Sequence, residues 1–143
     1  MARGSRYLHL VPHLQAVYYR ARDGSEPVDE FIEGLSTKRQ VALDNQIDRL
    51  NTLAPSMPHL PFPHSSQVDG ELRELRCHYG RELYRVLYRR SGNLVILLHI
   101  FRKDTREIPE HEIQVARDRW ADFKDRMNAR RRRPPRAAGH DAP

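Results

Sequence analysis

The stretch that decides the fold runs from residue 70 to residue 101 and reads GELRELRCHYGRELYRVLYRRSGNLVILLHIF. Its alternating or continuously apolar character predicts three β-strands, at 70–77, 82–89 and 94–101. Gly80 and Gly92 lie in the short connections, which suits tight hairpin turns. We therefore expect an antiparallel meander. The third strand is apolar on both faces, so it should be central or well covered.

Helical periodicity flanks this meander on both sides. Residues 27–35 and 37–54 carry apolar side chains every three or four positions, and a strand-like segment, 14–20, precedes them. Pro109 opens a third helix that continues to Met127, whereas the four prolines of 55–66 predict a loop. This order predicts an α+β domain: a mostly antiparallel sheet with two N-terminal helices and one C-terminal helix packed on one face.

The chain divides into an N-terminal extension, 1–13, a folded domain, 14–129, and an Arg-rich tail, 130–143. The tail holds five Arg and shows no apolar periodicity, so we expect it to be disordered. Deleting it should leave folding intact. Its Arg side chains either add non-specific affinity for RNA or serve only solvation.

Several classes of protein are disfavoured by composition. The longest apolar stretch is Leu94 to Leu98, far too short to span a bilayer. Residues 1–10 lack the apolar run of a secretory signal. A single cysteine, Cys77, excludes an internal disulfide and a cysteine-cluster metal site. We therefore expect a small cytoplasmic protein that is not associated with a membrane.

The positive charge is concentrated rather than spread along the chain. The net charge is +6, and residues 71–106 hold nine Lys or Arg against four Asp or Glu, while the tail adds most of the remainder. Charge confined in this way favours a polyanionic partner.

The alternation of side chains across a strand predicts where the basic residues point. If Tyr84, Val86 and Tyr88 face the helices, Arg85 projects from the opposite face, with Glu74 and Arg76 of the preceding strand beside it. The end of the next strand adds further cations, Arg102, Lys103 and Arg106. The result is a basic patch with one carboxylate, although the same residues also fit an ordinary solvated sheet face.

The order of short motifs resembles the RelE/HigB family of bacterial toxins, particularly its phage-derived HigB-like branch, over roughly residues 14–127. That branch carries G-x-L-[aromatic]-E-L-R, then R-x-x-Y, then L-L-H-x-F-x-K-x-T, then x-P-x-x-E-I-x-x-A. This chain supplies Gly70, Leu72, Glu74, Leu75, Arg76, Arg85, Tyr88, Leu97, Leu98, His99, Phe101, Lys103, Thr105, Pro109, Glu112, Ile113 and Ala116. It departs at Arg73, where the family usually has an aromatic residue, and in the Arg-rich tail.

The resemblance implies a RelE-like microbial-RNase-type fold. It also implies the function of a type II toxin–antitoxin toxin: an endoribonuclease that cleaves mRNA on the ribosome, inhibits translation and is neutralised by an antitoxin, usually a helix-turn-helix protein. By position, Arg85 matches the active-site arginine of the family, and Lys103 matches the basic residue at the end of the next strand. Arg76 and Glu74 fall on the same face.

Cleavage of RNA without a metal requires a base for the 2′-oxygen, cations for the phosphate and an acid for the 5′-oxygen. Arg meets phosphate oxygens with a planar fork, so Arg85 and Arg76 suit the second task. Lys103 suits either the second or the third task, and Glu74 is a candidate base. His99 and His78 are alternative acid or base residues, His99 being equally consistent with a core histidine. We expect additional RNA contacts from Tyr79, Arg89, Arg102 and Arg106.

No metal or cofactor is expected, because the eight histidines are dispersed and no carboxylate pair stands on the basic face to hold Mg²⁺. Two alternatives to a nuclease remain. One is a basic module that binds nucleic acid without cleaving it, and the other is a protein-interaction module. An Arg85→Ala variant that loses activity but keeps binding would distinguish the nuclease from the binding module.

Overall fold

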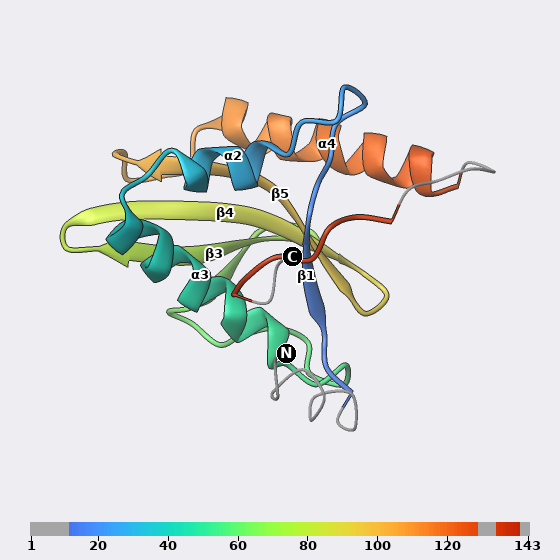
Figure 1. Ribbon diagram of the computed structural model, residues 1–143, viewed down its shortest axis with the longest axis horizontal. Helices are drawn as coiled ribbons and strands as arrows, with labels where there is room; N and C mark the ends of the chain where they lie inside the picture. Colours follow the sequence, from blue (N-terminus) through green and yellow to red (C-terminus); the bar gives the residue numbers. More distant parts are fainter. Residues whose placement is uncertain (1–11, 129–133, 141–143) are drawn as a thin grey trace.

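The computed structural model describes residues 12–128 and 134–140. A five-stranded sheet has the strand order β1-β5-β4-β3-β2, in which β1 runs parallel to β5 and the other neighbours are antiparallel. Figure 1 shows the arrangement. The elements are β1 (Gln15–Tyr18), α2 (Pro27–Glu33), α3 (Thr37–Asn51), β2 (Ser65–Asp69), β3 (Leu72–Tyr79), β4 (Glu82–Ser91), β5 (Leu94–Lys103) and α4 (Glu110–Met127).

This architecture confirms the α+β prediction and the meander of β3, β4 and β5, with bounds shifted by one or two residues. Gly80 and Gly92 have φ of 59° and 61°, a conformation that glycine adopts without steric cost, and they turn the two hairpins. The sequence analysis missed β2. This strand directly follows the proline-rich segment and exists because it pairs with β3. No helix within residues 12–128 and 134–140 is long and apolar enough to cross a membrane.

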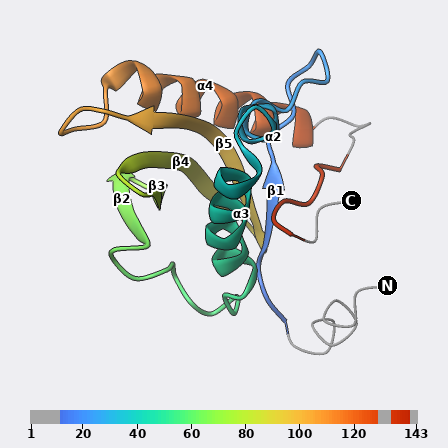
Figure 2. The same ribbon diagram turned by 60° about the vertical axis from the view of Figure 1, so that its left-hand side comes forward.

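The helices cover both faces of the sheet, so the prediction of helices on one face was wrong. Side chains from α2 and α3 share a core with Tyr84, Val86 and Tyr88 of β4. Residues of α4, including Phe123, pack with Leu87 on the other face. Figure 2 shows α3 and α4 on opposite sides of the sheet. The alternation of β4 was therefore predicted correctly, because a strand of period two has two apolar faces to cover.

A β-bulge in β5 changes which face its side chains occupy. Leu87 lies opposite His99 and Tyr88 opposite Leu97, so Leu98 is an extra residue on β5. Simple alternation placed His99 on the face of Val95 and Leu97, and that prediction was wrong. His99 instead lies on the α4 face, where it stacks on Phe101.

Residues 134–140 pack against the domain, so the predicted disorder of the tail is wrong for this part. Ala138 is fully buried, and Ala137 forms an antiparallel bridge with Val17 of β1. Arg136 binds Glu26 and Asp29 at 3.0 and 2.7 Å. The segment lies beside β1 in Figure 1 and covers its outer edge. The tail Arg residues at 130–133 lie outside the described residues.

Candidate active site

Four charged side chains gather on the α4 face of the sheet, near the β3–β4 hairpin that α4 leaves uncovered. Arg76 of β3 lies opposite Arg85 of β4, and Leu83 of β4 lies opposite Lys103 of β5. Glu74 precedes Arg76 on the same face, and its charge and those of both arginines act on Lys103. The structure thus brings together the four residues on which the sequence analysis based its catalytic hypothesis.

Arg85 is held rigidly at the centre of this cluster. Its side chain is only 3% exposed, and one terminal nitrogen donates to the carbonyl of Tyr84 at 3.0 Å. Its Nε lies 2.9 Å from Oε1 of Glu74, close enough for an ion pair, although the N–H is not aligned for a hydrogen bond. Burial lowers the pKa of Arg85, against the attraction of Glu74. An arginine nonetheless stays protonated, so the strand holds a fixed and poorly hydrated cation.

Glu74 contacts hydrogen-bond donors or cations with both of its oxygens. Oε1 faces Arg85, while Oε2 accepts from the hydroxyl of Ser66 on β2 and lies 3.4 Å from Arg76. The side chain is also buried. A carboxylate with these contacts orients two arginines. It is poorly placed to take a proton from a substrate, so its contacts do not favour the role of base.

Lys103 is the fourth member of the cluster and the end residue of β5. Its side chain is half-buried. Burial, followed by repulsion from Arg85 and Arg76, lowers its pKa. An ammonium group with a lowered pKa gives up its proton more readily, so this position suits a proton donor as well as a cation.

His99 is a structural residue by its contacts. Its Nε2 lies 2.6 Å from Glu112 and its Nδ1 lies 3.2 Å from Arg119, both on α4. Burial lowers its pKa, so the ring is neutral at pH 7. Because both ring nitrogens are occupied, His99 links α4 to the sheet and has no free nitrogen to serve as a base.

His78 remains available for chemistry. It is exposed, lies on the same face as Arg76 and is opposite Leu83 in the register. That register places His78 and Lys103 on the two sides of Leu83, about 10 Å apart at two strand spacings.

Two of the predicted RNA contacts lie on the other face of the sheet. Tyr79 stacks under Arg39 of α3, with the guanidinium 4.7 Å from the ring centroid. Arg102 lies opposite Tyr84, and its charge acts on Glu82 on the α3 side. The alternation that points Lys103 toward the cluster necessarily points Arg102 away from it.

The other two predicted contacts also lie outside the cluster. Arg89 stacks on Trp120 of α4, with its guanidinium 4.4 Å from the ring centroid, and pairs with Glu71 at 3.0 Å. Arg106 is exposed in the connection from β5 to α4. Both side chains are therefore peripheral to the arginine pair.

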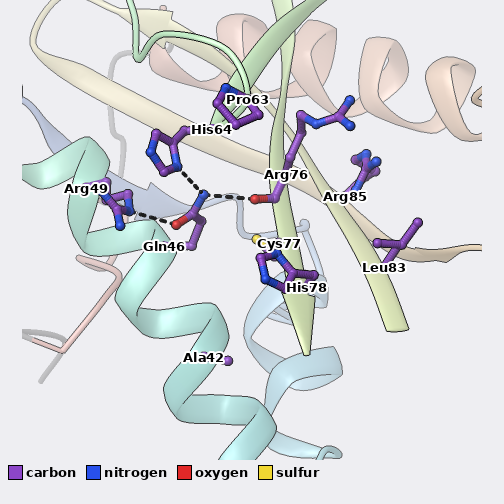
Figure 3. Close-up of a pocket in the computed structure, with 10 residues that line it drawn as sticks. All are labelled: Ala42, Gln46, Arg49, Pro63, His64, Arg76, Cys77, His78, Leu83 and Arg85. Carbon is purple, nitrogen blue, oxygen red and sulfur yellow. Dashed lines mark hydrogen bonds between the residues drawn. The ribbon is translucent and has the colours of Figure 1, made fainter. Parts of the chain in front are cut away.

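A pocket of about 370 Å³ adjoins the cluster where the edge of β3 faces α3. Figure 3 shows Gln46 of α3 bridging His64 and the backbone carbonyl of Arg76. The sequence analysis missed the contributions of α3 and of the proline-rich loop, since neither helix nor loop carries a motif that points there. The lining contains three arginines, two histidines and no acid: Ala42, Gln46, Arg49, Pro63, His64, Arg76, Cys77, His78, Leu83 and Arg85.

The donor set of the described residues offers no metal centre, because no group of three or more His, Cys, Asp or Glu side chains is placed to share an ion there. Cys77 lines the pocket but is 3% exposed, and burial raises the pKa of its thiol to about 12. A thiol in this state is a poor nucleophile.

The fold and the cluster define a small α+β protein with a preorganised anion-binding centre on its sheet. A family model for Gp49-like phage-derived proteins (DUF891) matches residues 30–121, from within α2 to within α4. The chain belongs to this family, which is part of the RelE toxin-like superfamily. No curated protein matches the sequence.

Proposed function

We propose that this protein is the toxin of a type II toxin–antitoxin system and cleaves mRNA on the ribosome by a metal-independent reaction through the 2′-hydroxyl. The observation that carries the proposal is the Arg85–Arg76–Lys103 cluster around Glu74. Membership of a toxin-like family supports it. The HigB-like branch, the helix-turn-helix antitoxin and the cytoplasmic location belong to the same proposal.

The chemistry follows from the positions of the side chains. In the reaction, the 2′-oxygen attacks phosphorus, the bond from phosphorus to the 5′-oxygen breaks, and the products are a 2′,3′-cyclic phosphate and a 5′-hydroxyl. Arg85 and Arg76 face the phosphate and stabilise the negative charge that develops on it. They are fixed before the substrate arrives, so little reorganisation is needed during the reaction.

Two proton transfers complete the cycle. Lys103, with its lowered pKa, protonates the 5′-oxygen as it leaves. His78 is the candidate base that we favour, because its ring is exposed on the cluster face, whereas Glu74 and His99 are occupied by other contacts. Glu74 acts as a positioning residue for the arginine pair.

The proposal is tested by analysing the RNA ends produced during translation in a reconstituted bacterial system. Wild-type protein should generate 5′-hydroxyl ends, and Lys103→Met and His78→Gln should slow cleavage by about 10²–10⁴-fold, the usual contribution of a general acid or base. Arg22→Ala, an exposed arginine paired with Asp122 and Asp125, is the matched control and should cut normally. Products with 5′-phosphate ends would overturn the mechanism, and binding without cleavage would favour the non-catalytic module.

A further inference from the structure

Phe62 is an exposed aromatic residue on an anchored loop. Its side chain is 71% exposed, the largest exposure among the large hydrophobic residues that the structure describes. Proline precedes and follows it, which restricts the backbone. Leu60 is buried below, and the N–H of His64 donates to the carbonyl of Pro61 at 2.9 Å, closing a turn. A ring held in water by such a turn loses little further freedom when a ligand covers it.

The ring of Phe62 lies beside the arginine cluster. The guanidinium of Arg76 sits 5.1 Å from the ring centroid, and the same side chain contacts Glu74 at 3.4 Å. Arg76 therefore connects Phe62 to Arg85. An aromatic face next to an arginine is the combination on which unpaired nucleobases stack in proteins that bind single strands.

The pocket behind Arg76 is lined with hydrogen-bond donors. Nε of Arg49 donates to Oε1 of Gln46 at 2.9 Å, which orients the amide. The amide nitrogen of Gln46 then donates to the carbonyl of Arg76 and to Nδ1 of His64. Since Nδ1 is an acceptor, the proton of a neutral His64 is on Nε2, and this ring is a donor. Among the described residues, no carboxylate lies within ion-pair distance of Arg49.

We propose that Phe62 and this pocket form a nucleotide-binding subsite for single-stranded RNA, in which a nucleobase stacks on Phe62 and a backbone phosphate enters the pocket near Arg49. The subsite rests on the proposed function, since it places the nucleotide adjacent to the bond that Arg85 and Lys103 address. Figure 3 shows Arg76 and Arg85 on one side of β3 and Arg49 on the other, so the strand would cross the edge of β3.

The test measures binding of a fluorescent, 2′-O-methylated RNA pentamer, which cannot be cleaved through the 2′-oxygen. Phe62→Ala should bind about 5- to 150-fold more weakly, the range for losing one base stack, while Phe62→Trp keeps the affinity. Met57→Ala is the matched control because Met57 is another exposed hydrophobic residue of the same loop, at 46%, and should change the affinity less than twofold. Arg49→Ala should flatten the salt dependence by about 0.7, one phosphate contact.

A pentamer with one abasic position identifies the stacked base. At one position, the abasic pentamer should weaken binding to wild type as much as Phe62→Ala does, and should cause no further loss in that variant. The subsite is refuted if Phe62→Ala binds like wild type, if the two losses add, or if wild type does not bind the pentamer below about 1 mM, the weak end of measurable affinity.

The pentamer assay is independent of the cleavage assay. Binding that depends on Phe62 without any cleavage would support the subsite and reject the nuclease. Cleavage with 5′-hydroxyl ends that is unaffected by Phe62→Ala, in a protein whose pentamer binding is also unaffected, would support the nuclease and reject the subsite.

Discussion

Replacing Arg85 is predicted to affect stability as well as activity, and the two effects can be separated. Arg85→Ala removes the cation 2.9 Å from Glu74, whose carboxylate is 7% exposed. Breaking a buried ion pair costs roughly 3–5 kcal/mol because the remaining charge stays buried. Ser66 and Arg76 still contact Glu74, so we expect the lower end of that range, about 3 kcal/mol.

Urea unfolding measures this cost. The Arg85→Ala midpoint should fall with the slope unchanged, whereas the double variant Glu74→Gln with Arg85→Met should lie within about 1.5 kcal/mol of wild type, since both charges are gone and a similar volume remains. The double variant should nonetheless lose roughly 10²–10³ in cleavage rate, because the phosphate cation is missing. Arg89→Ala should have a much milder effect on cleavage.

This reasoning has two points at which it can fail. An Arg85→Ala protein within about 0.5 kcal/mol of wild type, the range of ordinary surface substitutions, would show that the pair is not buried as described. A stable double variant with full cleavage activity would show that Arg85 does not address the phosphate.

Three further predictions concern other parts of the fold. A chain that ends at Arg133 should lose about 2 kcal/mol of unfolding free energy, because two backbone hydrogen bonds from residues 136 and 138 to β1 disappear at about 1 kcal/mol each; an unchanged thermal midpoint would contradict the packing of Ala138. The lowered pKa of His99 means that the unfolded chain binds its proton more readily, so the urea midpoint should fall as the pH drops below about 6.5, and His99→Gln should reduce this slope. Cys77 should react with iodoacetamide at pH 8 on the order of 10³-fold more slowly when folded than in urea, given the raised pKa of its thiol, and equal rates would show that the thiol is exposed.

The three-strand meander could be predicted because its determinants are local. Glycine turns, period-two alternation and short connections act between residues that are neighbours in the chain, so they specify the hairpins and place Arg85 and Arg76 on one face. The residues that escaped prediction depend on distant contacts. His99 faces α4 because Leu98 is an extra residue in its strand, and nothing in the run of apolar letters marks that bulge.

The sequence by itself therefore determined the class of fold, the order of the elements and the side of β4 from which the cluster projects. Only the tertiary structure decided that α4 covers the second face, that β2 completes the sheet and that residues 134–140 close its other edge. It also decided that Gln46, Arg49 and His64 meet at the pocket. The physical reason is that alternation and turns are set over a few bonds. The pairing of an edge strand or the docking of a helix depends on which apolar and polar surfaces remain uncovered after those local elements have formed.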